Sequence, residues 1–193
     1  MLDIKAHDTT PPAPGGLDVL QRFLNLHDHV EGLDGDRPPP TRMVRDFLVE
    51  RGLLDSDAPY TDGDHANALA LYRSLHERLR APDPGEPAAR HARELEAAAD
   101  RALLRIRFEG RPGLEPAADG VDAALGRLLA VLFLAELDGS WRQMKECASD
   151  SCTAVFYDRS KNRSGRWCSM RACGNKHKVR AWRERQRNDA IDA

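Results

Sequence analysis

Four cysteines are the residues of this chain whose spacing predicts a defined chemistry. Cys147, Cys152, Cys168 and Cys173 form two pairs with four residues inside each pair and fifteen between the pairs. Two such pairs suit a tetrahedral structural zinc, because each pair supplies two thiolates from one tight turn. Two disulfides or four unrelated buried thiols are the alternatives, but the pairs are equal in spacing and no other cysteine occurs. We expect one structural zinc per chain, since four thiolates leave no open position for catalytic water.

The segment around the cysteines predicts a hairpin and a helix. Residues 155–157 are typical of one strand, residues 158–165 of a turn, and residues 166–167 of the returning strand. Ser169 is a suitable N-cap for a helix that runs to Arg187. A hairpin and a helix that share four cysteines resemble a treble-clef finger.

One face of the expected helix combines apolar and amide side chains. Asn175, Val179, Trp182 and Gln186 recur at intervals of four, three and four residues, so they lie on one side. We expect this face to pack on the hairpin with Trp182 as its anchor. Trp141 is likewise expected in the core, because a small finger needs its large apolar residues.

Charge is distributed unevenly along the chain. The formal net charge is −2, but residues 141–193 hold 13 Lys and Arg against 6 Asp and Glu, so the remainder is acidic. Clustered positive charge on a small module suits the phosphates of a nucleic acid. The candidate nucleic-acid-binding residues are Arg159, Lys161, Arg163, Arg166, Arg171, Lys176, Lys178, Arg180, Arg183 and Arg187. The alternatives are a solvated face that binds nothing, or charge that offsets the zinc thiolates or docks on the acidic part.

Several motifs in this segment are those of a known family. They are Cys147-Ala148 with Cys152, Phe156-Tyr157-Asp158-Arg159-Ser160-Lys161-Asn162-Arg163-Ser164, Arg166-Trp167-Cys168-Ser169-Met170 and Cys173-Gly174-Asn175-Lys176. Together they closely resemble the CGNR zinc-finger family over the last quarter of the chain. The arginine that gives the family its name is Lys176 here, which keeps the charge but loses the bidentate fork.

Weaker motifs upstream resemble the ABATE domain that usually precedes this finger. They are Arg22-Phe23-Leu24-Asn25, residues 48–54 with Gly52, and Leu114-Glu115-Pro116. The two resemblances imply a stress-related bacterial transcription regulator with a helix-rich N-terminal domain and a finger that binds DNA.

The chain before the finger is mainly helical by its apolar periodicity. Helices are expected from residue 17, over 41–52, from 62 or 64 onward, over 87–104 and from 117 onward, and alternation over 104–108 predicts one short hairpin. We therefore expect a mainly α chain: a flexible arm (1–16), a helical ABATE-like domain (17–140), the finger (141–187) and a disordered tail (188–193). Because the apolar stripes are complete by Gly139, the helical domain is expected to fold alone.

The helical domain offers few residues for a ligand. Arg22 and Asn25 are the candidates for binding a small effector, although an amide such as Asn25 commonly bonds a neighbouring backbone instead. A homodimer is the other role open to this domain. We find no nucleotide-binding loop, no nucleophile elbow and no second His after His76-Glu77, and so expect no enzyme.

The sequence favours a zinc-dependent DNA-binding regulator. The alternative is a zinc module for RNA or protein partners without direct DNA binding. The N-terminus lacks a cationic start and an apolar core of a signal peptide, and no apolar run approaches the roughly 20 residues of a membrane span, so we expect a cytoplasmic location and no membrane partner.

Overall fold

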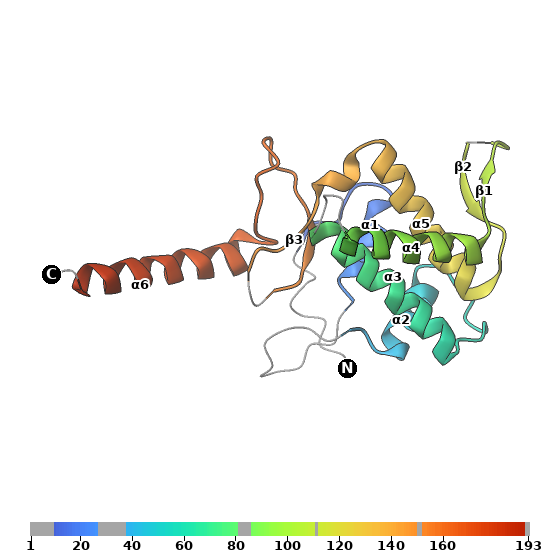
Figure 1. Ribbon diagram of the computed structural model, residues 1–193, viewed down its shortest axis with the longest axis horizontal. Coiled ribbons are helices and arrows are strands. Elements are labelled where there is room, and N and C mark those ends of the chain that lie inside the picture. The colour runs from blue at the N-terminus through green and yellow to red at the C-terminus, as the bar shows by residue number, and fades with distance from the viewer. Residues whose placement is uncertain (1–9, 27–37, 81–85, 111, 150–151, 192–193) are drawn as a thin grey trace.

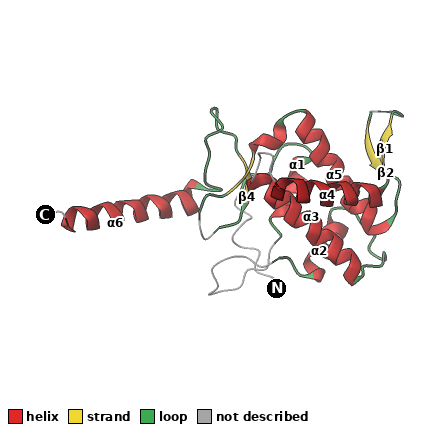
Figure 2. Cartoon of the chain, viewed as in Figure 1, coloured by secondary structure: helices red, strands yellow, loops and turns green. Residues whose placement is uncertain are grey.

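The computed structural model describes residues 10–26, 38–80, 86–110, 112–149 and 152–191, which form a helical body and one projecting helix (Figure 1). Within these residues the body contains α1 (Leu17–Leu24), α2 (Thr41–Glu50), α3 (Asp62–Arg80), α4 (Glu86–Ala102) and α5 (Gly120–Leu137). Two antiparallel hairpins pair β1 (Leu104–Arg107) with β2 (Gly113–Pro116) and β3 (Met144–Glu146) with β4 (Val155–Tyr157). A 3₁₀ turn (Ser140–Gln143) precedes β3, and a π-helical turn (Met170–Gly174) leads into α6 (Asn175–Ile191). The expected mainly α fold is confirmed (Figure 2).

The central helix of the body is α5. It packs against α1, α4 and β2, and Leu125 and Leu128 are at most 1% exposed. Gly126 allows the close approach of α4, because a Cβ on it would lie 2.5 Å from the Cβ of Ala102. Leu134 is 46% exposed, because six residues place it about 120° around α5 from the buried Leu128. No helix in the described ranges combines the length and apolarity needed to cross a membrane.

The end of the expected flexible arm is packed on α1. Of residues 1–16, the structure describes 10–16, and Ala13 among them is 5% exposed. The backbone N–H of Ala13 donates to Oε1 of the buried Gln21 at 2.6 Å. The expected disordered tail likewise begins as helix, since α6 continues to Ile191.

The pairing of the finger hairpin differs from the expected one. β4 pairs with β3, with Lys145 opposite Phe156, whereas residues 166–167 form no strand. The hairpin loop therefore contains the first cysteine pair. The expected return over 166–167 was wrong because residues 158–165 close a loop around a buried carboxylate instead of a tight turn.

The hairpin packs on the body. Trp141, Met144 and Val155 belong to the same apolar core as Leu20 and Phe23, and all five side chains are at most 5% exposed. Trp141 is thus a core residue, as expected. This core crosses the boundary that the sequence suggested after Ser140.

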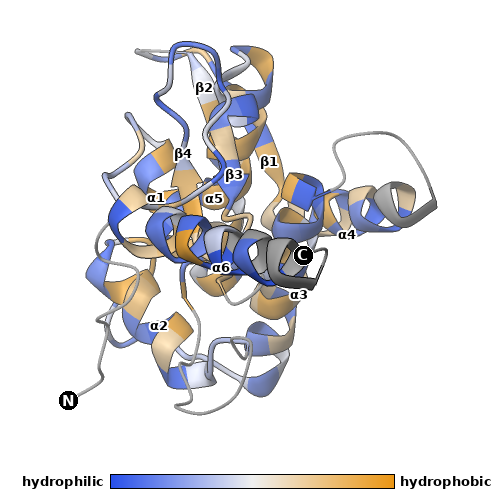
Figure 3. Cartoon of the chain, turned by 90° about the vertical axis from the view of Figure 1, so that its left-hand side faces the viewer, coloured by the Kyte–Doolittle hydropathy of each residue, from blue (hydrophilic) through white to orange (hydrophobic). Residues whose placement is uncertain are grey.

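Helix α6 extends away from the body with its apolar face uncovered (Figures 1 and 3). Val179 is 48% exposed and Trp182 is 56% exposed. The expected packing of this face on the hairpin is therefore wrong. The physical reason is that α1 and α3 already cover the hairpin, so its apolar side chains have no surface left for α6.

Candidate metal centre

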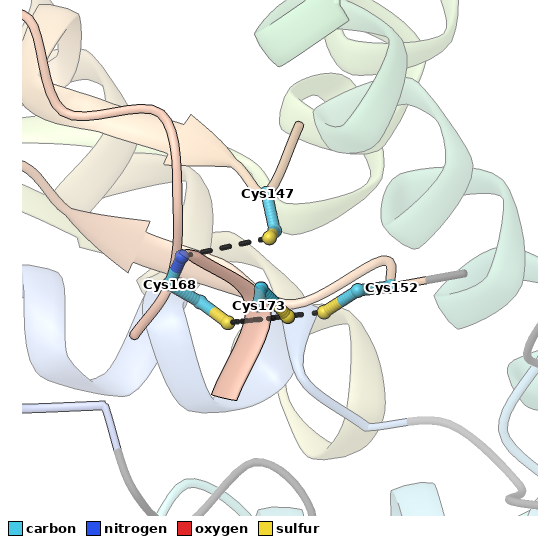
Figure 4. A group of neighbouring side chains, drawn as sticks. All are labelled: Cys147, Cys152, Cys168 and Cys173. Atoms are coloured by element: carbon cyan, nitrogen blue, oxygen red, sulfur yellow. Dashed lines mark hydrogen bonds between the residues drawn. The ribbon is translucent and has the colours of Figure 1, made fainter. Parts of the chain in front are cut away.

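The four cysteine sulfurs form one compact cluster (Figure 4). All four Sγ atoms lie within 4.8 Å of one another. The Sγ of Cys168 is 3.8 Å from that of Cys152 and 3.7 Å from that of Cys173. A tetrahedral zinc with bonds of about 2.3 Å to sulfur separates its ligands by about 3.8 Å, so the cluster has the size such a site requires. The cluster is consistent with one structural zinc, as the sequence predicted.

The protonation of the thiols favours a cation. The hydrogen bond from Cys168 lowers the pKa of Cys152 to about 5, and the same bond raises the pKa of Cys168. Burial raises the pKa of Cys173 to about 11. The lowered pKa of Cys152 favours its thiolate, whereas the raised pKa values of Cys168 and Cys173 favour their thiols. A bound zinc replaces those protons, so binding releases them to solvent.

Backbone hydrogen bonds place the first cysteine pair at the end of the hairpin. The N–H of Cys147 donates to the carbonyl of Ala154 at 2.9 Å, which extends the β3–β4 ladder by one step. The N–H of Cys152 donates to the carbonyl of Ser149 at 2.9 Å and closes a tight turn. Both sulfurs are thereby directed to the same side of the strand ends.

The second pair is held by a capped helical turn. Ser169 accepts a hydrogen bond at its Oγ from the N–H of Ala172, at 3.4 Å, as the expected N-cap. Its carbonyl accepts from the N–H groups of Cys173 and Gly174 at 3.0 Å. Across the two pairs, the N–H of Cys168 donates to the Sγ of Cys147 at 3.5 Å, a contact that stabilises a thiolate.

A buried carboxylate organises the loop over residues 158–165. Asp158 is 3% exposed and accepts hydrogen bonds from the N–H groups of Ser160 and Gly165 and from the ammonium group of Lys145. Burial raises the pKa of Asp158, but these hydrogen bonds outweigh it and hold the pKa well below its ordinary value. Gly165 must lack a side chain here, because a Cβ would lie 2.6 Å from Oδ1 of Asp158.

All ten of the predicted basic residues are exposed to solvent, on or next to the ordered loop and α6. Exposed residues are Arg159, Lys161, Arg163, Arg166, Arg171, Lys176, Lys178, Arg180, Arg183 and Arg187. Arg159 and Arg166 also have internal partners: Arg159 donates to the carbonyl of Pro12 at 2.6 Å, and the guanidinium of Arg166 lies over the ring of Trp167. The loop ends three residues before Cys168, and α6 begins two residues after Cys173. Positive charge is therefore gathered on two segments of the chain, one on each side of the second cysteine pair.

Asn25 joins α1 to the hairpin. Its Nδ2 donates to the carbonyl of Val155 and its Oδ1 accepts from the N–H of Val155, both at 2.8 Å. The amide thus pairs with β4 as a neighbouring strand would. Arg22 lies one turn earlier and pairs with Asp18 at 3.0 Å. The two residues suggested for effector binding therefore have protein partners, and Asn25 bonds a backbone as its amide chemistry allowed.

Glu146, which directly precedes the first ligand Cys147, links β3 to α3. Its two carboxylate oxygens accept hydrogen bonds from Arg80 at 2.5 and 2.6 Å. Nδ1 of the buried His76 lies 3.3 Å from Oε1 of Glu146, and Nε2 lies 3.0 Å from the carbonyl of Leu24. Burial raises the pKa of Glu146, but His76 and Arg80 together bring it below the ordinary value.

Sequence reasoning found the ligands and the basic residues but missed the residues that hold them. The sequence around Asp158 could have predicted the loop over residues 158–165. An Asp followed two residues later by Ser is typical of a turn in which the carboxylate accepts a backbone hydrogen bond. Lys145, Glu146 and Arg80 gave no local signal, because their partners lie far away in the sequence.

Comparison with known proteins bears on this segment alone. Residues 143–186 match the model of the family described as CGNR zinc finger. No curated protein matches the chain. The matched residues contain both cysteine pairs, the loop over 158–165 and α6 as far as Gln186. The four-cysteine cluster accordingly lies within a segment, residues 143–186, that matches the CGNR zinc finger, and its geometry is consistent with one structural zinc.

Proposed function

We propose that the protein is a cytoplasmic, zinc-dependent transcription regulator that binds duplex DNA through the finger. The observation that carries the proposal is the exposed positive charge on α6 and on the loop over 158–165. Between Met170 and Arg187 the chain has seven Lys and Arg and a single acidic residue, Glu184. Pairing along the helix therefore leaves most of this charge for an external anion. Phosphates spaced along a duplex have the charge and the spacing that two such surfaces require.

In this proposal the zinc of the finger has a structural role. Zinc would fix the start of α6 relative to the ordered loop, since the loop leads into Cys168 and α6 follows Cys173. Four thiolates leave no position for a substrate, so we propose no enzymatic activity for this site.

We further propose that the helical body senses an effector or forms a dimer. This role is supported by the links between the body and the finger. Asn25 bonds the backbone of Val155, and Arg80 bonds Glu146 beside the first ligand. A ligand or a second copy that displaced α1 or α3 would therefore act on the hairpin that carries Cys147.

The test measures the binding of zinc-loaded protein to fluorescent duplex DNA over a range of salt concentrations. Replacing Arg183 and Arg187 by alanine should weaken binding to every duplex and flatten the slope of log K against log salt by about 1.8, at about 0.9 for each phosphate that is no longer neutralised. Arg73→Ala with Arg105→Ala removes two exposed arginines of the body and is the matched control.

Zinc content and helix content should be the same in both double variants. Unchanged binding by Arg183→Ala/Arg187→Ala at all salt concentrations would contradict the proposal. Binding to structured RNA or to protein, with none to duplex DNA, would favour the alternative of a zinc module for those partners.

A further inference from the structure

The uncovered face of α6 has a composition that phosphate binding does not explain. We call Asn175, Val179, Trp182 and Gln186 the central stripe. They lie on one open surface of α6, and all four are exposed. A solvated basic helix needs neither a tryptophan that is 56% exposed nor a valine that is 48% exposed. Apolar groups in this position gain free energy only when a partner covers them.

Basic residues border the central stripe on both sides. Lys176, Arg183 and Arg187 follow the stripe along one edge, at about 70° to 110° around the helix, and Lys178 lies at a similar angle on the other edge. Arg171 extends the second edge into the π-helical turn. A partner of this face must therefore be anionic along both edges and must offer less charged groups between them.

A second copy of α6 does not meet that description. If two such helices paired along their stripes, the positions that flank the seam would bring Lys178 of one copy against Arg183 of the other. Like charges that face each other across a helix pair destabilise it. The major groove of a duplex does meet the description, because phosphates line both walls and base edges form the floor.

We infer that α6 enters the major groove of DNA and that the central stripe reads base edges with a preference for A·T pairs. This inference rests on the proposed function and adds sequence recognition to it. The amides of Asn175 and Gln186 have the donor and acceptor that match N7 and N6 of adenine. Val179 and Trp182 are apolar and suit the methyl group of thymine.

The dimensions of the helix fit this placement. A groove about 12 Å wide admits an α-helix. From Asn175 to Gln186 the stripe rises about 16 Å, which corresponds to about five base pairs. Figure 1 shows that α6 stands clear of the body, so the walls of a groove can approach it from both sides.

The experiment starts from a pool of duplexes with a random core, from which zinc-loaded full-length protein selects its preferred sequences. Binding by fluorescence anisotropy is then compared between a selected duplex and a scrambled one. We expect enrichment of A·T-rich cores and at least a tenfold difference in affinity. Asn175→Ala/Gln186→Ala should bring that ratio close to one and leave binding to the scrambled duplex unchanged.

The matched control separates recognition of bases from electrostatic attraction to phosphates. Arg183→Ala/Arg187→Ala should weaken both duplexes by the same factor and keep their ratio. Zinc content and circular dichroism verify that each variant is folded. Trp182→Phe keeps an apolar ring and should retain A·T selection, whereas Trp182→Ser should reduce it.

The outcomes distinguish recognition of base sequence from DNA binding itself. Duplex binding without enrichment, or an unchanged ratio in Asn175→Ala/Gln186→Ala, overturns base reading and leaves the proposed function intact. Tighter binding to a poly-glutamate peptide than to any duplex assigns the stripe to a protein partner and overturns the inference. If the parent protein binds no duplex at all, the proposed function itself fails.

Discussion

The substitution Asn25→Ala tests whether α1 holds the zinc finger in place. It removes both hydrogen bonds between Asn25 and Val155. The backbone N–H and carbonyl of Val155, which is 0% exposed, then lack the partners that Asn25 provided. Gln21 still donates to that carbonyl, but only at 3.4 Å. The orphaned N–H of Val155 costs about 1–3 kcal/mol, and the carbonyl, which keeps its bond from Gln21, loses one bond worth about 1 kcal/mol, so the free energy of unfolding should fall by about 2–4 kcal/mol.

Urea unfolding in excess zinc, followed by circular dichroism, measures this change. The rate at which a chelator removes zinc should also rise, because β4 leads away from the turn that carries Cys152. Asn67→Ala is the control, since this asparagine lies in α3 and has no such bonds to the finger within the described part of the chain. A loss within about 0.5 kcal/mol of the control, with the same rate of zinc release, would refute the role assigned to Asn25.

Three further outcomes follow from the metal site and the packing around it. Cys173→Ser should reduce bound zinc from one per chain to none by metal analysis, because three thiolates cannot close the shell that supplies on the order of 10–16 kcal/mol to a small finger. A chain that ends at Gly139 lacks Trp141, Met144 and Val155, and its near-UV circular dichroism should lose the signal of a packed core; a native spectrum would contradict the shared core. The pKa of Glu146 is lowered in the folded protein, so its stabilising effect is present above its unfolded pKa of about 4.3 and is lost as pH falls through the folded value. Between about pH 5 and pH 3 the parent should therefore lose more stability in urea than Glu146→Gln, and equal losses would contradict this role.

The sequence predicted the parts of this fold that depend on local pattern. The helices of the body, the β1–β2 hairpin and the Ser169 cap follow from apolar periodicity and capping chemistry, and all are present. The cysteine cluster follows from spacing alone. In each of these features, the residues that specify it lie close together in the sequence.

The errors concern contacts between distant segments. The strand that begins at Val155 was expected to pair with residues 166–167, but it pairs with residues 144–146, and the backbone of Val155 also bonds Asn25, 130 residues away. Once the body covers the hairpin, α6 has no surface to pack on, so Trp182 is exposed. A pattern on one helix shows that a face is apolar, but it does not show which surface covers that face.

The metal centre joins two parts of the chain that differ in how firmly they are held. Cys147 follows a hairpin anchored in the core, whereas Cys173 leads directly into α6, which is about 25 Å long. A tilt of α6 by about 10° at the metal site would therefore move the far end of the helix by about 4 Å. One base-pair step is about 3.4 Å, so if α6 binds a duplex as proposed above, such a rotation would shift its outer contacts by a whole step. Asn25 and Arg80 bond the hairpin from the body, so they hold the fixed side of the site from which α6 extends.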